Sequence, residues 1–452
     1  MNEKTFRPWN PDQQWLFPPS VHDFVPEGHL AHFIRDTVRD ALDLSAIMET
    51  YQEARGYPPY HPAMMTALLL YAYCQGVYSS RRIAKACEER VDFMAVTGMQ
   101  RPDFRTVSDF RRRHLEALGQ LFVQVLRLCR QAGLVKMGHV ALDGTKVKAN
   151  ASKHKAMSYG RMKKAERRLA EEVERWLKKA ESVDEEEDER YGSDRRGDEM
   201  PAWVADKQQR LARIREAKAA LEAEARVKER EKGDDPPGGK PDGTARRRRG
   251  PKPKEPRAPG KPKTSAQRNF TDPDSRIMKT IHGFEQCYNA QAAVDAGSQV
   301  IVARGLTNNA SDQGQLQPMV EQMAKLHDSP PRELSADADY CSDDNLAELE
   351  RRGIRGYVAT GRQRTDAPHA AGNLPFTPGT RRARMRTRLK RGGWRSRYRL
   401  RKQTVEPVIG QIKEARNFRR FFLRGIYKVA HEWSLVCTAH NLLKLAAASV
   451  RT

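Results

Sequence analysis

The chain has 452 residues and a formal net charge of +24, from 82 Lys and Arg residues against 58 Asp and Glu residues. This length exceeds that of a single hydrophobic core, so we expect two or three domains. The longest apolar stretch, Ala63–Cys74, is shorter than the about 20 residues that span a bilayer, so a membrane protein is not expected.

The positive charge indicates a polyanionic partner. A basic surface concentrates polyanions, and the phosphate backbone of nucleic acid is the commonest of them. An RNA- or ribosome-binding protein and a charge confined to basic tails remain alternatives at this point. The six cysteines form no Cys-x-x-Cys pair, which is typical of free thiols in a reducing compartment. We therefore expect a cytoplasmic protein.

Residues 1–135 are predicted to form an all-helical N-terminal domain. Apolar residues recur at helical spacing from Leu30 to Leu42 and again after Pro62. The run Thr106–Asp109 has the form of a capping box, which predicts one long helix continuing to Cys129.

A short turn at Gly76–Ser80 is followed by three cations on a predicted helix, Arg81, Arg82 and Lys85. This order fits a helix-turn-helix, which would bind DNA. It also fits a basic, solvated face on a helical bundle, and the lack of a clear recognition-helix pattern favours that second interpretation.

A strand and a long charged segment follow. His139–Asp143 is a short apolar run that ends on an acid before Gly144, which predicts a strand and its turn. Two segments rich in Ala, Leu, Glu, Lys and Arg come next, Lys155–Ser182 and Trp203–Lys232. Their composition predicts two long helices that pack as an antiparallel hairpin.

The domain boundaries are expected where the composition changes. Residues 136–156 and 265–450 should form one α/β domain, which the charged helical hairpin at 157–234 interrupts. Residues 235–264 are rich in Pro, Gly, Lys and Arg and are predicted to be a disordered basic linker.

The order of strands and helices in the α/β domain is that of a ribonuclease-H-like fold, with a mixed sheet and helices on both faces. A strand hairpin is followed by alternating helices and strands, so the sheet should be antiparallel first and parallel afterwards. A very basic loop, Arg381–Arg397, should precede a helix at Tyr398–Ala415 and a last apolar helix at Tyr427–Ala447. The other predicted strands and helices are Cys287–Val294, Gln299–Gly305, Gln313–Leu326, Arg332–Ala336, Asp343–Arg352 and Gly356–Thr360.

Three acids, Asp143, Asp337 and Glu406, occupy positions from which they could converge. The first two end predicted strands, where α/β sheets form crevices, and Glu406 lies on a helix that could lean over them. Three carboxylates suit Mg²⁺ or Mn²⁺, and two such ions can activate a nucleophile and stabilise the leaving oxygen at a phosphodiester. Each acid alone also has an ordinary interpretation, as a turn residue, a helix cap or an ion-pair partner.

The helix with Glu406 also places two cations near this acid. Lys402, Glu406 and Lys413 share one face if each residue turns the helix by about 100°. That arrangement fits a metal ligand beside phosphate-binding groups, and it fits equally an exposed network of ion pairs.

Three segments resemble the bacterial insertion-sequence transposases of the DDE type: Ala141–Lys146, Ala336–Tyr340 and Thr404–Lys413. The resemblance extends from about Pro8 to Leu443, except in the charged insertion. Four shorter segments support it: Thr271–Ser275, Tyr288–Gln291, Ala310–Asp312 and Glu432–Leu435.

The resemblance implies metal-dependent cleavage at the ends of a mobile DNA element and 3′-hydroxyl strand transfer into target DNA. It assigns catalysis and the binding of two Mg²⁺ or Mn²⁺ ions to Asp143, Asp337 and Glu406, with Asp339 as an alternative to the second acid. Such enzymes often have a Tyr and an Arg at set distances before the Glu, and here Arg399 and Lys402 stand at those places. Residues expected to contact DNA are Lys146, Tyr398, Arg401, Lys402 and Lys413.

The expected partners are double-stranded DNA, both as terminal inverted repeats and as target, and further copies of the chain in a homodimer or higher oligomer. The N-terminal domain would bind DNA ends or another subunit, the basic loop Arg381–Arg397 would contact the DNA backbone, and the protein would associate with the bacterial nucleoid. Two alternatives remain: an inactive or regulatory DNA-binding derivative, and a nuclease on the same fold.

Overall fold

The computed structural model describes most of the chain. The described residues are 20–51, 58–191, 202–233, 261–327, 329–361, 371–372 and 376–449.

A six-stranded mixed sheet forms the centre of the molecule, with strand order β4-β5-β1-β7-β8 and with β6 also paired to β5. The strand β1 runs antiparallel to β5 and parallel to β7, and β7 runs parallel to β8. The predicted change from antiparallel to parallel pairing is therefore confirmed. The strands are β1 (His139–Lys148), β4 (Arg276–Thr280), β5 (Gly283–Asp295), β6 (Ile301–Thr307), β7 (Glu333–Ala336) and β8 (Arg355–Val358).

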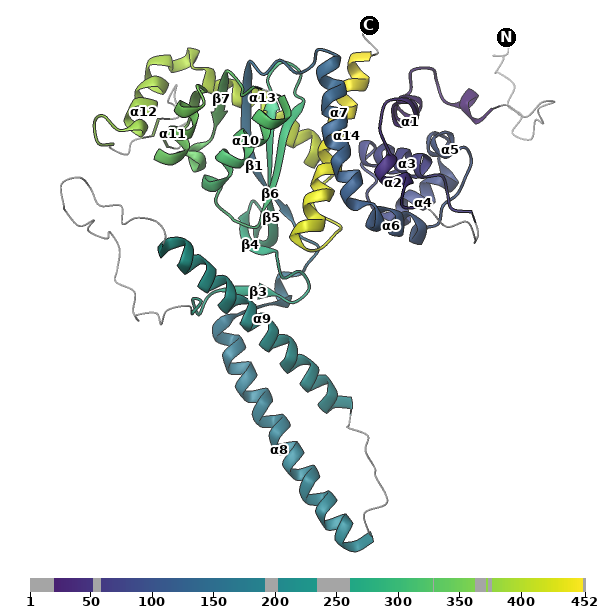
Figure 1. Cartoon of the computed structure of the whole chain (residues 1–452), viewed down its shortest axis with the longest axis vertical. Coiled ribbons are helices and arrows are strands. Elements are labelled where there is room, and N and C mark those ends of the chain that lie inside the picture. Colours follow the sequence, from purple (N-terminus) through teal and green to yellow (C-terminus); the bar gives the residue numbers. More distant parts are fainter. Residues whose placement is uncertain are drawn as a thin grey trace, which may run out of the picture.

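Helices cover both faces of this sheet (Figure 1). Ala292 on β5 pairs with Asp143 on β1 and with Arg304 on β6. Side chains of paired residues point to the same face of a sheet, so Asp143 and Arg304 share a face. The Arg304 guanidinium lies over the Phe122 ring of α7, so α7 lies on that face. The α/β helices are α10 (Leu316–His327), α11 (Asp343–Arg351), α12 (Arg381–Gly392), α13 (Leu400–Gly410) and α14 (Ile426–Ser449).

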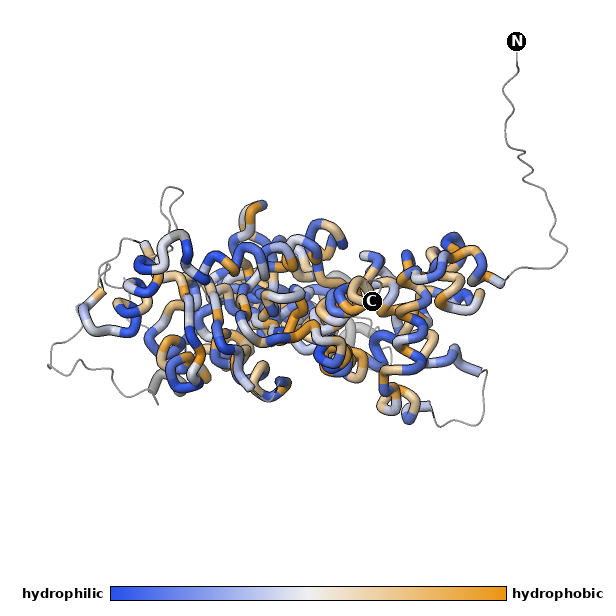
Figure 2. Tube along the Cα trace, turned by 90° about the horizontal axis from the view of Figure 1, so that it is seen from above, coloured by the Kyte–Doolittle hydropathy of each residue, from blue (hydrophilic) through white to orange (hydrophobic). Residues whose placement is uncertain are grey.

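The N-terminal region is helical, as predicted. Its helices are α1 (Leu30–Asp40), α2 (Ser45–Met48), α3 (Pro62–Cys74), α4 (Ser80–Glu89), α5 (Val91–Thr97), α6 (Phe104–Arg113) and α7 (Leu115–Gln131). Hydrophobic and hydrophilic positions alternate along most of them (Figure 2). Their buried side chains and those of the sheet form one continuous hydrophobic core, with α7 packed along α14. Residue 135 thus marks a change of secondary structure within a shared core.

The charged insertion forms a helical hairpin that projects from the body as an arm (Figure 1). Its helices are α8 (Tyr159–Tyr191) and α9 (Ala202–Gly233), and the short strands β2 (Ala156–Ser158) and β3 (Gln267–Asn269) pair at its base. A separate small core holds the two helices together, and it includes Met162, Leu169 and Ile214. The predicted hairpin is confirmed.

Two helical predictions are corrected. The long helix expected from Thr106 to Cys129 is broken at His114, and Asp103 caps its first part by accepting from the backbone N–H groups of residues 105 and 106. The basic loop expected at Arg381–Arg397 is a helix over its first part, α12. Thr380 caps that helix, and Met385 and Leu389, four residues apart, are buried on one side.

The strand prediction was also incomplete. The strand β4 was missed, as was the β2–β3 pair, because both are short and rich in polar residues. Most of the segment predicted to be disordered lies outside the described residues. Its last part, from residue 261, is described and leads into β3, where Asn269 is buried.

Candidate active site

Asp143 and Asp337 lie side by side where the parallel pairing of β1 and β7 ends. The last paired residues are Leu142 and Ala336, and the two acids come directly after them. Adjacent strands lie about 4.8 Å apart, so the two carboxylates project from neighbouring backbone positions. Burial raises the pKa of Asp143 to about 6, and the charge of Asp337 contributes in the same direction.

Asp143 does not end its strand, contrary to the prediction. The strand β1 continues to Lys148 and pairs with β5 along its whole length, whereas β7 stops at Ala336. Among the described residues, the edge of β1 from Asp143 to Val147 therefore has no neighbouring strand, and Lys148 forms an isolated bridge with Arg420. The acid pair lies at the start of this open edge.

Arg401 connects Asp143 to Glu406. Its Nη2 donates to Asp143 Oδ2 at 2.7 Å, and its Nη1 donates to Glu406 Oε1 at 3.0 Å. Burial disfavours the charged guanidinium, but the charge and hydrogen bond of Asp143, together with contributions from Tyr398 and Asp337, outweigh it and raise the pKa of Arg401. The structure thus brings the first and third predicted acids together through one cation that they share.

Asp337, rather than Asp339, faces this arrangement. Asp337 is half-buried, its Oδ1 accepts the backbone N–H of Asp339 at 3.0 Å, and the Asp339 side chain is exposed. Burial raises the pKa of Asp337, while the charge of Arg401 opposes that rise. The competing acid therefore lies outside the group formed by Asp143, Asp337 and Arg401.

Tyr398 and Arg401, and not Arg399 and Lys402, are the residues of this segment that approach the acids. Tyr398 is buried, and burial raises the pKa of its hydroxyl with further contributions from Asp337 and Asp143. Lys402 is exposed. Tyr398 and Arg401 each lie one position before the place that the family resemblance gives to Tyr and Arg. The 3₁₀ turn at Arg397–Arg399, just before α13, still directs them toward the acids.

Lys413 and Lys146 meet at the open edge of β1. Lys413 Nζ donates to the backbone carbonyl of Lys146 at 2.8 Å, and burial lowers the pKa of Lys413. Of the shared face predicted for Lys402, Glu406 and Lys413, the first two residues are both exposed on α13, and the place of Lys413 on that face stays a prediction. A single π-helical turn, Gln411–Ala415, follows α13 and changes the rotation per residue between Glu406 and Lys413.

Gly144 occupies a strand and not the predicted turn. A Cβ atom on it would lie 2.4 Å from Asp312 Oδ1 and 2.4 Å from Gln291 Nε2. Only a residue without a side chain leaves room for these two groups beside β1. An Asp-Gly pair is typical of a turn, and the sequence does not show the steric need for Gly144, because Asp312 and Gln291 lie far from it along the chain.

Asp312 is the residue that sequence reasoning missed. It is buried, its Oδ1 accepts from Gln291 Nε2 at 2.7 Å, and its Oδ2 accepts from Lys146 Nζ at 3.3 Å. Tyr340 donates its hydroxyl proton to the same Gln291 side chain. The signal was present, since residues 288–291 and 310–312 both belong to segments of the family resemblance. Their contact became apparent only in the fold.

The carboxylates of Asp143, Asp337 and Glu406 are groups that can bind a divalent cation. Carboxylate oxygens are the ligands that Mg²⁺ and Mn²⁺ prefer, and Asp143 and Glu406 already share a cationic group, the Arg401 guanidinium. Within the described residues, no three His, Cys, Asp or Glu side chains lie close enough together to hold one ion. Arg401 separates Glu406 from the acid pair, so the expected convergence of three acids is seen for two of them.

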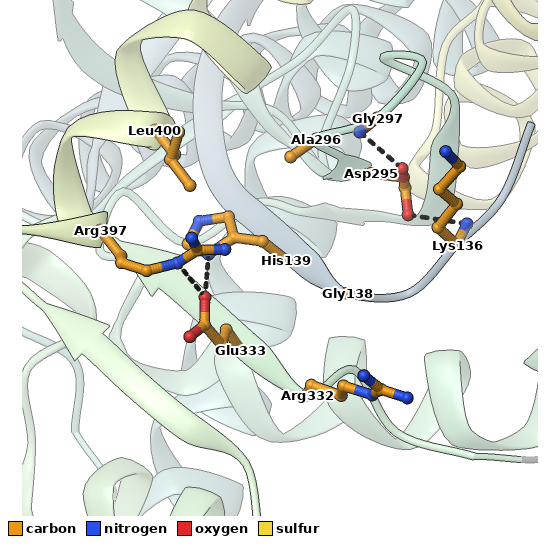
Figure 3. A pocket seen from close by; sticks show the side chains of 10 residues that line it. All are labelled: Lys136, Gly138, His139, Asp295, Ala296, Gly297, Arg332, Glu333, Arg397 and Leu400. Atoms are coloured by element: carbon orange, nitrogen blue, oxygen red, sulfur yellow. Dashed lines mark hydrogen bonds and ion pairs between the residues drawn. The ribbon is translucent and has the colours of Figure 1, made fainter.

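A cavity of about 510 Å³ lies at the opposite end of β1 (Figure 3). Its wall includes Glu333, which accepts from His139 Nδ1 at 3.1 Å and from Arg397 Nε at 2.5 Å. Arg397 lies just before α13, so this cluster fixes the start of the helix with Arg401 and Glu406. The cavity is separate from the acid pair, about four residues or 13 Å along the strand.

The arginines of α12 are largely engaged within the protein. Arg381 and Arg384 both donate to Glu350, at 2.8 and 3.0 Å, and Arg388 donates to the Gly356 carbonyl at 3.0 Å. The expected contact of this segment with DNA therefore stays a prediction, and it falls mainly on Lys390, Arg391 and the residues after them.

The predicted helix-turn-helix segment is partly buried against the α/β core. All of α3 from Met65 is buried, and Tyr78 in the turn donates to the Arg416 carbonyl at 2.9 Å. On α4 the Lys85 side chain pairs with Glu89 at 3.4 Å. These contacts fit a basic solvated face, and DNA reading by α4 stays a prediction.

Two segments of the chain match known protein families. Residues 19–113, which include α1 to α6, match the family described as Transposase domain (DUF772). Residues 372–446, which include α12, α13 and most of α14, match the family described as Transposase DDE domain. No curated protein and no solved structure matches the chain. Within the part of the chain that the structure describes, no helix is long and apolar enough to cross a membrane.

Proposed function

We propose that the chain is an insertion-sequence transposase of the DDE type and that Asp143, Asp337 and Glu406 are its catalytic carboxylates; the matches of residues 19–113 and 372–446 to transposase families support this. The observation that supports this assignment is the shared Arg401, which holds Glu406 and Asp143 in one hydrogen-bonded group beside Asp337. Burial of all but Glu406 gives these charges a low-dielectric surrounding, where their interaction with a cation is strengthened.

The proposed reaction is cleavage of the ends of a mobile DNA element and transfer of the 3′-hydroxyl to a phosphodiester of target DNA. When bound to the three acids, two Mg²⁺ or Mn²⁺ ions would activate the attacking oxygen and stabilise the leaving oxygen. Asp143 and Asp337 would hold ions from the end of the parallel strands, and Glu406 from α13. Arg401 must then exchange at least one of its carboxylate partners.

The cations at the open edge of β1 are proposed to bind the DNA backbone. Lys146 and Lys413 lie together there, each fixed by a protein oxygen, and an ammonium group of this kind pairs with phosphate as a point charge. Tyr398 is buried within electrostatic reach of Arg401 and would help to orient it. Lys402 is exposed on α13 and would contact the backbone from the solvent side.

Double-stranded DNA is the proposed partner, as terminal inverted repeats and as target. A homodimer or higher oligomer is proposed because two element ends must be held together during transposition. The helical N-terminal region would provide either the end-binding surface or the subunit contact. The protein is proposed to act in the bacterial cytoplasm, on nucleoid DNA.

The test is cleavage of a duplex that contains the terminal repeats of the element. We expect the parent protein with Mg²⁺ or Mn²⁺ to cut at the element ends, and Asp143→Asn, Asp337→Asn and Glu406→Gln to lose the activity. Asp339→Asn is the matched control and should retain it. Equal cleavage by the Asp143→Asn and Glu406→Gln variants would overturn the assignment of the site.

A joined-product assay distinguishes the two alternative functions. A nuclease on this fold would give free ends without strand transfer, and a DNA-binding derivative would bind the repeats without cutting them. The transposase predicts both cleaved ends and products joined to a target plasmid.

A further inference from the structure

The arm formed by α8 and α9 continues directly from the strand with Asp143. After β1 ends at Lys148, the chain forms β2 and enters α8. The base of the arm therefore lies beyond the carboxyl end of β1 (Figure 1). The base is firmly attached. Glu224 of α9 pairs with Arg268 at 2.7 Å and with Arg276 of β4 at 3.0 Å. The arm base therefore keeps a fixed position relative to the acids.

Charge is strongly segregated along α8, the first helix of the arm. Residues 153–168, at its base, include seven Lys and Arg residues and a single acid, Glu166. Residues 181–189, toward its far end, include seven acids and no Lys or Arg. A helix that is merely solvated has no need of such a separation, since mixed charges along a helix stabilise it through pairs three or four residues apart.

Most of the positive charge at the base is not paired with an acid among the described residues; Arg167 and Arg168 are the exceptions, paired with Glu171 and Glu172. Glu166 is itself paired with Lys218 at 2.7 Å and with Arg215 at 3.4 Å, both on α9. Five exposed cations of this segment form no ion pair with any acid that the structure describes. We call them the basic collar: Lys153, Lys155, Arg161, Lys163 and Lys164.

Lys153, the first residue of the basic collar, lies within one turn of duplex DNA from Asp143. The ten residues from Asp143 to Lys153 can span at most about 34 Å, because an extended chain advances about 3.4 Å per residue. One turn of B-DNA has the same length, about 34 Å or ten base pairs. A duplex with a phosphate at Asp143 is therefore long enough, within one turn, to reach Lys153 at the start of the collar.

We propose that the basic collar binds the phosphate backbone of duplex DNA within about one helical turn of the cleaved phosphate. The proposal rests on the proposed function, since it takes the DNA at Asp143 as its starting point. The acidic far end of the arm would repel the same duplex, so the DNA is confined to the base. The insertion would thus supply a second contact with the DNA backbone, outside the α/β part of the catalytic domain.

The experiment measures DNA affinity against salt concentration for two duplexes. Both contain an element end, one with five base pairs on each side of the cleavage position and one with twenty. The variant is the triple substitution Arg161→Gln, Lys163→Gln and Lys164→Gln, where Gln is chosen because it preserves helix propensity. The control removes three charges from exposed cations that have acidic partners: Arg39→Gln, Lys178→Gln and Lys325→Gln.

On the long duplex we expect the slope of log affinity against log salt to become less negative by about 2.7 in the triple variant, about 0.9 for each lost phosphate contact. From 50 to 200 mM salt the parent should then lose about 40-fold more affinity than the variant. The control and the short duplex should show no such change.

The failure of this proposal differs from the failure of the proposed function. If the triple variant and the control give the same slope on the long duplex while the parent still cleaves element ends, the basic collar does not bind DNA. An equal change on both duplexes would overturn its placement. A parent that neither binds nor cleaves element ends would overturn the proposed function itself.

Discussion

Arg401 donates a 2.7 Å hydrogen bond to Asp143, and both side chains are only 12% exposed. The same guanidinium reaches Glu406 at 3.0 Å. Without an ion in the site, Arg401 therefore balances the charge of carboxylates that would otherwise repel one another. This contact links the stability of the protein to the occupancy of its catalytic site.

Arg401→Gln should destabilise the protein without metal and increase its response to metal. Removing one partner of a buried ion pair costs about 3–5 kcal/mol, and protonation of Asp143, whose pKa is raised to about 6, reduces that cost. The free energy of unfolding in urea, measured with and without Mn²⁺, provides the test. We expect a larger Mn²⁺ stabilisation in the variant than in the parent.

The control is Arg381→Gln, which removes an exposed arginine paired with Glu350 at 2.8 Å. Exposed pairs contribute roughly 0–1 kcal/mol, so this variant should resemble the parent in both measurements. An identical Mn²⁺ stabilisation in Arg401→Gln and the parent would show that Arg401 and the metal do not compete for the same acids.

Gly144→Ala should destabilise the protein because its Cβ would lie 2.4 Å from both Asp312 Oδ1 and Gln291 Nε2. Gly144 is half-buried, and overpacking against the buried Asp312 and Gln291 side chains costs about 1–3 kcal/mol. Gly138→Ala, just before the same strand, is the control, since a Cβ atom there would meet nothing within 4 Å. Urea unfolding of the two variants compares them directly, and equal stabilities would mean that Asp312 and Gln291 move aside at little cost.

Most strands of the sheet could be predicted from sequence because they contain short apolar runs and, after β6, alternate with helical segments; β4, which is short and polar, could not. The details of the site depend on contacts between distant segments, which spacing cannot reveal. Gly144 looks like a turn until Asp312 is placed beside it. The sequence does not show that Arg401, and not Lys402, contacts the acids, because the irregular 3₁₀ turn at Arg397–Arg399 sets the rotation of α13. The helix α12 was missed because its basic composition resembles that of a solvated loop.

Glu432 should make stability depend on pH. It is fully buried on α14 and accepts the backbone N–H groups of Phe422 and Leu423 at 3.1 and 2.9 Å. Burial raises the pKa of Glu432 to about 7, although these hydrogen bonds and the charge of Arg111 oppose the rise. In the unfolded chain a Glu titrates near pH 4.3.

Because the folded pKa lies above the unfolded one, the unfolded state loses its proton first as pH rises. The stabilising contribution is thus complete below about pH 4.3 and falls until about pH 7, by roughly 3 kcal/mol. Glu432→Gln should remove this part of the pH dependence, as measured by urea unfolding at pH 5 and pH 7.5. Glu414→Gln, at an exposed acid, should keep it. The expectation would be contradicted if the free energy of unfolding changed with pH to the same extent in the parent and in Glu432→Gln.

Asp312 should affect DNA cleavage through Lys146. Its Oδ2 accepts from Lys146 Nζ at 3.3 Å, whereas its Oδ1 is held by Gln291. Asp312→Asn keeps the shape of the side chain, but it would present an N–H donor to the ammonium group and release Lys146 from its position. We therefore expect Asp312→Asn to reduce cleavage of element ends to the same extent as Lys146→Gln.

A double-mutant cycle distinguishes this positioning role from a general loss of structure. If Asp312 acts only through Lys146, the double variant should cleave no more slowly than either single variant, because the interaction is already lost in each. Two independent roles would multiply their effects instead. Urea unfolding of the same proteins separates the two causes further. A loss of cleavage that tracks the loss of stability would point to damage of the buried Gln291–Asp312 contact. A loss of cleavage at unchanged stability would follow from a misplaced Lys146 alone.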